Sequence, residues 1–233
     1  MPQAFGLTDR GLVRPVNQDA FLIDEQLGLY LVADGMGGAK AGEKASALAL
    51  ETVARHFRRA GADADLVLAY QAAHAAVREY AAADFCCAGM GTTLVGVHLT
   101  PGGVHLASAG DSRAYFWSDG KLEQLTKDHS WIEEVGRRIG LCEDVLKKHP
   151  FRHVITMAIG VESELDVRQR RLVPPLNSRL LLCSDGLHGY VSDETIGETL
   201  GSGRSLESRA HQFIEASKRA GAPDNVTVVL IDF

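Results

Sequence analysis

The sequence predicts an α+β fold of four layers (αββα). A central antiparallel β-sandwich is covered by α-helices on both of its outer faces. Two patterns indicate it: runs in which every second residue is apolar, and alanine-rich stretches with apolar residues three or four positions apart. Short turns rich in glycine and aspartate separate consecutive strand-like runs, which favours antiparallel neighbours. Elements of both kinds need partners for their apolar faces, and stacked layers supply them.

The first half of the chain contains most of the expected strands. Three short strands come first, and the third ends at the glycine-rich segment Asp34–Gly38. Two long helices follow, and then the apolar period drops to two. The expected elements are strands Ala4–Thr8, Ala20–Ile23 and Leu29–Ala33, helices Ala41–Arg59 and Ala64–Ala83, and strands Thr93–Leu99, Gly103–Ala109, Ala114–Trp117 and Lys121–Leu125.

The segment Asp128–Arg152 has helical spacing, but it is mixed in charge and weakly apolar. We therefore expect an excursion from the core, a flap of about residues 128–153 within one domain of 233 residues. No repeat or linker divides the chain. The elements expected after the flap are strands Val154–Ala158, Val167–Leu172, Arg179–Cys183 and Val226–Ile231, and helices Asp193–Leu200 and Leu206–Arg219.

Composition excludes several classes of protein. Hydrophobic residues make up 45% of the chain and charged residues 23%, which suits an ordinary globular core. A net charge of -6 lacks the positive field that nucleic-acid binders use, so we expect no nucleic-acid partner. The segment Met1–Arg10 has no signal-peptide pattern, and no apolar run approaches the roughly 18 residues of a membrane span. We expect a cytoplasmic protein with no membrane partner, and a monomer.

The sequence lacks the motifs of several classes of enzyme. The four cysteines are neither spaced for zinc nor followed six positions later by arginine, which excludes phosphatase chemistry with a thiol nucleophile of that pattern. The chain has no GxSxG elbow, no HExxH and no GxxxxGK[ST] loop. Serine hydrolase, zinc protease and P-loop kinase chemistries are therefore not indicated.

Five aspartates stand at expected strand ends, four of them beside glycine, serine or asparagine and the first of them two positions after Asn17: Asp19, Asp34, Asp111, Asp185 and Asp224. Taken singly, such pairs favour a turn. Asp34 and Asp185, however, each follow an apolar strand directly, so their carboxylates emerge from the core, where an acid is costly without a cation or donors.

Carboxylates that converge repel one another, and a hard divalent cation bound by oxygen relieves the repulsion. Oxygen ligands alone favour Mg²⁺ or Mn²⁺ over zinc or copper. Two such ions about 3.5 to 4 Å apart can hold a bridging water and direct it at a phosphoryl group. Arg14, close before Asp19, could hold phosphate oxygens opposite the ions. His149 and His153, at the end of the expected flap, are candidates for substrate contact.

Six segments in order resemble the motifs of bacterial PPM (type 2C) phosphatases, which are metal-dependent serine/threonine protein phosphatases. The resemblance spans nearly the whole chain, and six motifs in the right order are far more specific than one DGxGG. The segments are Thr8–Asp19, Val32–Gly38, Met90–Thr93, Ala109–Arg113, Cys183–Leu187 and Pro223–Thr227.

The resemblance implies a centre of two Mn²⁺ or Mg²⁺ ions. In it, Asp34 would bridge the two ions, the carbonyl of Gly35 would bind one of them, and Asp185 and Asp224 would complete the other. Asp111, together with Asp185, matches residues that hold a third, weaker ion in bacterial members.

The resemblance also assigns Arg14 to the phosphate, Asp19 to ordering a metal-bound water, and the flap to substrate choice. Gln18 stands where many members have Glu, which could weaken one metal site. Met36 stands where eukaryotic members have His, a candidate proton donor, so another group must supply any proton that the leaving group needs.

The resemblance implies hydrolysis of phosphoserine and phosphothreonine in a phosphorylated protein by a metal-activated water, without a phosphoenzyme. Two alternatives stay open. One is a phosphohydrolase of small molecules that uses the same centre. The other is a catalytically silent binding protein of the same fold, against which the retained Asp34, Asp185 and Asp224 argue.

Overall fold

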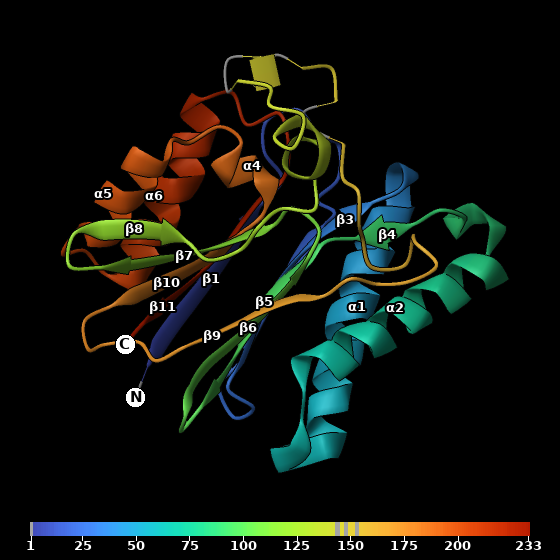
Figure 1. Ribbon diagram of the computed structural model, residues 1–233, viewed down its shortest axis with the longest axis horizontal. Coiled ribbons are helices and arrows are strands. Elements are labelled where there is room, and N and C mark those ends of the chain that lie inside the picture. The colour runs from blue at the N-terminus through green and yellow to red at the C-terminus, as the bar shows by residue number, and fades with distance from the viewer. Residues whose placement is uncertain (1, 143–144, 147–148, 152–153) are drawn as a thin grey trace.

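Two antiparallel sheets pack face to face, and helices cover the outer face of each sheet (Figure 1). The structure is a computed structural model that describes residues 2–142, 145–146, 149–151 and 154–233. The expected order of layers, αββα, is confirmed. Among the residues that the structure describes, no helix has the length and apolar content of a membrane-spanning segment.

The first sheet joins the two ends of the chain. Its strands lie in the order β1, β11, β10, β7, β8, and every neighbouring pair is antiparallel. Because β11 lies between β1 and β10, the loop that precedes β11 meets the loop that follows β1. The bounds are β1 Gln3–Asp9, β7 Arg113–Ser118, β8 Lys121–Gln124, β10 Arg179–Cys183 and β11 Val226–Asp232.

The second sheet has the order β2, β3, β5, β6, β9, and the two-residue strand β4 pairs with the end of β3. Strands β2 and β3 form a hairpin whose register places Asp19 opposite Asp34. The bounds are β2 Asp19–Asp24, β3 Leu29–Met36, β4 Gly91–Thr92, β5 Leu94–Thr100, β6 Gly103–Ala109 and β9 Arg168–Leu172.

Helices α1 (Gly38–Ala60) and α2 (Leu66–Ala83) cover the second sheet, whereas α5 (Asp193–Gly201) and α6 (Leu206–Arg219) cover the first (Figure 1). Three short helices connect longer elements: η1 Gly61–Asp63, η2 Phe85–Cys87 and α4 Asp185–His188. Asp65 caps the start of α2, where its carboxylate accepts a hydrogen bond of 3.0 Å from the N–H of Leu68.

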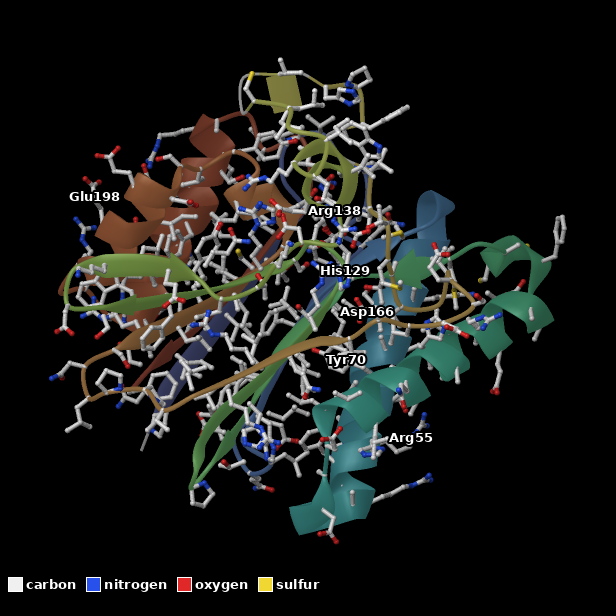
Figure 2. The ribbon with its side chains drawn as sticks, in the orientation of Figure 1. Arg55, Tyr70, His129, Arg138, Asp166 and Glu198 are labelled. Carbon is white, nitrogen blue, oxygen red and sulfur yellow. The ribbon has the colours of Figure 1, made fainter. Side chains whose placement is uncertain are left out.

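Three apolar layers hold the elements together, and the central strands contribute to two of them. In β3, Leu29, Leu31 and Ala33 face the helices α1 and α2, while Tyr30 and Val32 face the opposite sheet. Burial on both faces explains why this strand is continuously apolar instead of alternating. Tyr70 of α2, labelled in Figure 2, donates a hydrogen bond of 3.1 Å to the buried carbonyl of Ala107.

Two sequence predictions between β8 and β9 are wrong. Helix is expected over Asp128–Arg152, but the longest regular piece that the structure describes there is one π-helical turn, η3 (Ile132–Gly136), and Gly140 follows it with a φ of 80°. Val154–Ala158 is not a strand. Single bridges tie Ile155 to Ser130 and Ile159, just after this segment, to Thr92, so the chain contacts two distant segments in turn here.

Two phenylalanines should differ strongly in their contribution to the free energy of unfolding. Phe57 on α1 is 2% exposed and Phe85 in η2 is 94% exposed. Phe57→Ala leaves a cavity between α1 and the second sheet, and we expect it to lower the free energy of unfolding by about 3–5 kcal/mol. Phe85→Ala, the matched control, should change it by less than about 0.5 kcal/mol. Urea unfolding followed by circular dichroism measures both, and equal effects would contradict this packing.

Candidate metal and phosphate site

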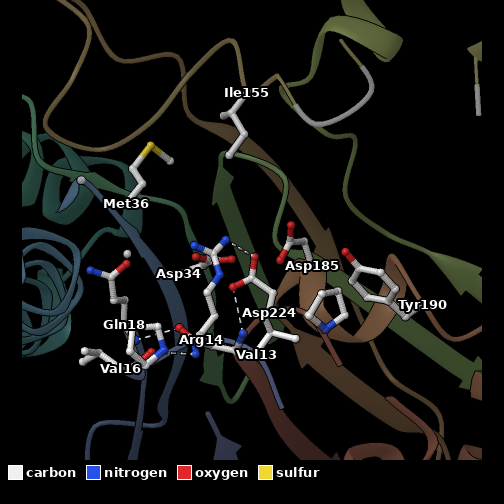
Figure 3. A pocket seen from close by; sticks show the side chains of 15 residues that line it. Val13, Arg14, Val16, Gln18, Asp34, Met36, Ile155, Asp185, Tyr190 and Asp224 are labelled. Carbon is white, nitrogen blue, oxygen red and sulfur yellow. Dashed lines mark hydrogen bonds and ion pairs between the residues drawn. The ribbon is translucent and has the colours of Figure 1, made fainter. Parts of the chain in front are cut away.

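A cavity of about 880 Å³ opens at one end of the sandwich, where several chain segments meet (Figure 3). The polar floor of this cavity contains five of the residues expected from the sequence. They come from the loop between β1 and β2, the end of β3, the start of α4 and the loop before β11. These residues are Arg14, Asp34, Gly35, Asp185 and Asp224.

The glycines that follow Asp34 and Asp185 are needed for close packing, not for turns. Gly35 lies within β3, and a Cβ there would stand 2.1 Å from the carbonyl oxygen of Gly42. Gly186 lies within α4, where a Cβ would stand 1.9 Å from the carbonyl oxygen of Asn225. Both contacts are shorter than any side chain allows. The backbone therefore approaches its neighbours so closely at both aspartates that only glycine fits.

Asp34 is held through its backbone by the two threonines of the Met90–Thr93 segment. The N–H of Asp34 donates to Thr93 Oγ1 at 3.1 Å, and its carbonyl accepts from Thr92 Oγ1 at 2.8 Å. Thr93 Oγ1 also lies 2.7 Å from Ser112 Oγ, in the segment that carries Asp111. These hydroxyl groups position Asp34 while leaving its carboxylate directed at the cavity.

Asp19 lies behind the cavity, opposite Asp34 in the β2–β3 register. Ser184, the residue before Asp185, donates a hydrogen bond of 2.7 Å to Asp19 Oδ2. The N–H of Thr227 in turn donates to Ser184 Oγ at 3.0 Å. Asp19 is thus a buried support that links the two sheets, and it does not line the cavity.

Asn225 fastens the loop that carries Arg14. Its amide nitrogen donates to the carbonyls of Arg10 at 2.8 Å and Val16 at 3.0 Å, and its Oδ1 accepts from the N–H of Gln18 at 2.9 Å. Sequence reasoning missed this role, because an asparagine after an aspartate reads only as a turn former. The signal available was its place in the motif that contains Asp224.

Arg14 points from this loop to Asp224, with 2.7 Å between Nη2 and Oδ2. The hydrogen bond to Asp224, with the nearby charges of Asp185 and Asp34, raises the pKa of Arg14 above its ordinary value. The Arg14 side chain is 52% exposed, so it is accessible to a ligand in the cavity.

Asp111 also stands behind the cavity, near the buried His129 and the partly buried His188. His188 Nε2 donates to the Asp111 carbonyl at 3.0 Å, and the N–H of Gly110 donates to His129 Nδ1 at 3.2 Å. His129 Nε2 lies 3.2 Å from Asp166, and both residues are labelled in Figure 2. Burial lowers the pKa of both histidines, that of His188 well below its usual value. These histidines are structural, and the sequence did not single them out.

The carboxyl groups of Asp19, Asp34 and Asp111 resist ionisation in this arrangement. Burial, followed by the charge of Asp19 and then those of the other aspartates, raises the pKa of Asp34 well above its usual range. Burial also raises the pKa of Asp19 to about 7, and burial with the charge of Asp185 raises that of Asp111 well above normal. The buried Oδ1 atoms of Asp19 and Asp111 accept no hydrogen bond from the described residues.

Such a set of oxygens fits a hard divalent cation, which would lower the energy of the ionised carboxylates and favours oxygen ligands. In the described part of the chain, no three His, Cys, Asp or Glu side chains already stand at the spacing of metal ligands. Asp224 is instead bonded to Arg14. A cation that uses Asp224 must therefore displace this arginine from the carboxylate.

The two flap histidines are not placed at the site by this structure. His149 stacks on Trp131, with ring centroids 4.1 Å apart and planes at 10°, and Phe151 packs edge-on against Trp131. Among the described residues, His149 is not part of the cavity lining. His153 lies outside the described residues. Their contact with substrate stays a prediction.

The family of the chain follows from comparison with known proteins. The protein phosphatase 2C family matches residues 13–227, which include Arg14 and all five aspartates. The chain belongs to the protein phosphatase 2C family. This confirms the family that the six motifs indicated.

Relatives within the 2C family match nearly the whole of this chain, although PstP is a longer protein. The serine/threonine phosphatase stp of Listeria welshimeri is 33% identical, and the alignment covers 97% of this chain and 93% of that protein. PstP of Mycobacterium tuberculosis is 39% identical over 97% of this chain and 44% of its own length. A structure of the catalytic domain of PstP in complex with two manganese ions has a TM-score of 0.85 and 35% identity, covering 99% of this chain and 97% of that one.

The raised carboxylate pKa values predict how the metal-free 2C domain responds to pH. The unfolded Asp19 releases its proton near 3.8, whereas the folded one keeps it up to about 7. The contribution of Asp19 to the free energy of unfolding therefore falls by about 2–4 kcal/mol as the pH rises between these two values. In EDTA, the melting temperature should fall from about pH 5 to about pH 8, and less so in Asp19→Asn.

Mn²⁺ added at the higher pH should restore the melting temperature, because a cation stabilises the ionised carboxylates. The exposed Asp63 offers the matched control, and Asp63→Asn should follow the wild-type profile. A melting temperature in EDTA that is flat over this range for wild type and both variants would contradict the electrostatic description.

Proposed function

We propose that this chain hydrolyses phosphoserine and phosphothreonine in proteins, with a binuclear centre of Mn²⁺ or Mg²⁺. The observation that carries the proposal is the convergence of Asp34, Asp185 and Asp224 with Arg14 on one cavity. Membership of the 2C family over residues 13–227 and the two manganese ions in the similar PstP structure support it. When bound, the ions supply charge neutralisation and a water of lowered pKa.

Each residue at the floor has a distinct part in this proposal. Asp34 would bridge the two ions from the end of β3, and the carbonyl of Gly35 would bind one of them. Asp185 and Asp224 would complete the other. Close backbone packing at Gly35 and Gly186 fixes the elements that carry Asp34 and Asp185. Both aspartates are therefore in position before a ligand binds.

Arg14 would hold the phosphate of the substrate. Its guanidinium group is planar and can donate two parallel hydrogen bonds to phosphate oxygens. The ion pair with Asp224 keeps the guanidinium at the cavity before a ligand arrives. Exchange of Asp224 for the phosphate then needs only a small movement of a half-exposed side chain.

Asp19 and Asp111 act from behind the floor. Asp19 would order a water of the centre, and its hydrogen bond from Ser184 keeps its carboxylate beside Asp34 and Asp185. Asp111, together with Asp185, would hold a third and weaker ion. Burial and the charge of Asp185 raise the pKa of Asp111. This favours the interpretation, because a cation would stabilise the ionised carboxylate against both effects.

We propose further that the protein is a cytoplasmic monomer that acts in signalling, without nucleic-acid or membrane partners. The flap of residues 128–153 would influence its choice of substrate. The net charge of -6 supports the absence of a nucleic-acid partner. Analytical ultracentrifugation tests the monomer.

Phosphate release from a phosphothreonine peptide tests the activity. We expect release with Mn²⁺ or Mg²⁺ and none in EDTA. Asp34→Asn and Asp185→Asn should lower kcat/KM by at least about a thousandfold, because each removes a ligand of the charge-neutralising centre. Arg14→Ala should raise KM and lower kcat/KM by about ten- to a hundredfold through lost phosphate contacts.

Asp63→Asn, on the exposed turn η1, is the control and should retain wild-type turnover. Release of phosphate from small phosphate esters but from no phosphopeptide would identify a small-molecule phosphohydrolase. A folded protein that binds Mn²⁺ and releases no phosphate from either substrate would identify a silent binding protein.

The third ion is tested separately by metal titration. Calorimetry with Mn²⁺ should resolve two tighter sites and one weaker site in the wild type. Asp111→Asn should lose only the weaker site, because Asp111 does not line the cavity that holds the other two ions. A titration of Asp111→Asn identical to that of the wild type would remove Asp111 from the metal site.

A further inference from the structure

Apolar side chains line much of the wall of the active-site cavity, in contrast to its floor. Val13, Met36, Ile155 and Tyr190 stand around the central carboxylates in Figure 3. Among the described lining residues, the charged side chains are Arg14 and the three aspartates of the floor. The described wall therefore offers a substrate apolar surface and no charge.

Two of these wall residues are exposed to a degree that needs an explanation. Val13 is 67% exposed and Tyr190 is 37% exposed, and Leu12 beside Val13 is 62% exposed. Exposed apolar side chains that gather around one cavity mark an interaction surface, whereas isolated ones need no reason. Here they lie directly beside the place where the phosphate of a substrate would be held.

Both sides of this surface are held firmly by backbone contacts. The N–H of Leu12 donates to the carbonyl of Ala222 at 2.9 Å, and Asn225 fastens the rest of the loop that carries Val13. Tyr190 follows α4 directly, and its N–H donates to the carbonyl of Leu187 at 3.1 Å. The backbone that carries these side chains is therefore ordered before a ligand arrives, which lowers the entropic cost of contact.

We infer that Val13, Ile155 and Tyr190 form an apolar clamp for the residues that flank the phosphorylated serine or threonine of the substrate. The clamp selects substrates with bulky apolar neighbours over substrates with charged ones. This inference rests on the proposed phosphatase activity and deepens it by naming the class of peptide. With the phosphate at Arg14 on the floor, the flanking residues lie against the walls, where a charged side chain would lose water without gaining a partner.

Peptides of one length and different flanks test the clamp. Each contains one phosphothreonine, with leucine, aspartate or lysine on both sides, and N-acetyl phosphothreonine N-methylamide serves as the substrate without flanks. For the wild type with Mn²⁺, we expect kcat/KM for the leucine peptide to exceed that for either charged peptide by about five- to tenfold, mainly through KM. Equal values, or a preference for a charged peptide, would overturn the inference.

Variants then show whether Tyr190 carries the preference. Tyr190→Ser and Val13→Ser should each reduce the preference for leucine by about threefold or more, and Tyr190→Phe should keep it because the ring is retained. Tyr80→Ser is the matched control, since Tyr80 is 40% exposed on α2 and does not line the cavity. If Tyr190→Ser lowers kcat equally for all four substrates, its role is structural and the clamp is wrong.

The same experiment separates this inference from the proposed activity. Hydrolysis of all three peptides at equal kcat/KM would leave the phosphatase activity in place and reject the clamp. Absence of hydrolysis of every peptide by the folded, Mn²⁺-loaded wild type would reject the phosphopeptide activity itself, and the clamp with it.

Discussion

The repulsion among carboxylates gathered at one end of the sandwich is the constraint on which the rest of the site depends. Asp19 and Asp34 face each other across a strand pair, where like charges are destabilising, and Asp19 is buried while Asp34 is partly buried. Ser184 donates directly to Asp19, while Thr92 and Thr93 fix the backbone of Asp34. These contacts fix the positions of the acids without neutralising them. The arrangement is therefore favourable chiefly with a cation present, which makes metal dependence a property of the fold itself.

The scaffold that brings the acids together is rigid because its central strands are buried on both faces. β3, β10 and β11 each contribute to two apolar layers, and each adjoins one of the aspartates of the cavity floor. A strand that is packed on both sides cannot shift without disturbing two cores. The close contacts at Gly35 and Gly186 add to this restraint. Selectivity, in contrast, is left to the wall of the cavity, where Val13 and Tyr190 extend from loops.

Burial of the central strands on both faces also explains which parts of the fold were predictable. The continuously apolar runs of β3, β10 and β11 are visible in the sequence, and so are the acids that follow or precede them. The segment from Asp128 to Ala158 was not predictable, because single bridges to distant residues replace regular pairing there. The roles of Asn225, Ser184 and His188 were also hidden, since each depends on a partner far away in the chain. Gly35 and Gly186 were visible, but their reason was misread as turn formation.

The insertion of β11 between β1 and β10 has a consequence for the newly made protein. Arg14 and Asp224, which form an ion pair at the floor, are separated by 210 positions in the sequence. Asn225, which fastens the Arg14 loop, enters the fold together with Asp224. A nascent chain that still lacks this last strand therefore has neither the complete carboxylate set nor a fastened arginine loop. Assembly of the complete site therefore requires closure of the first sheet by β11.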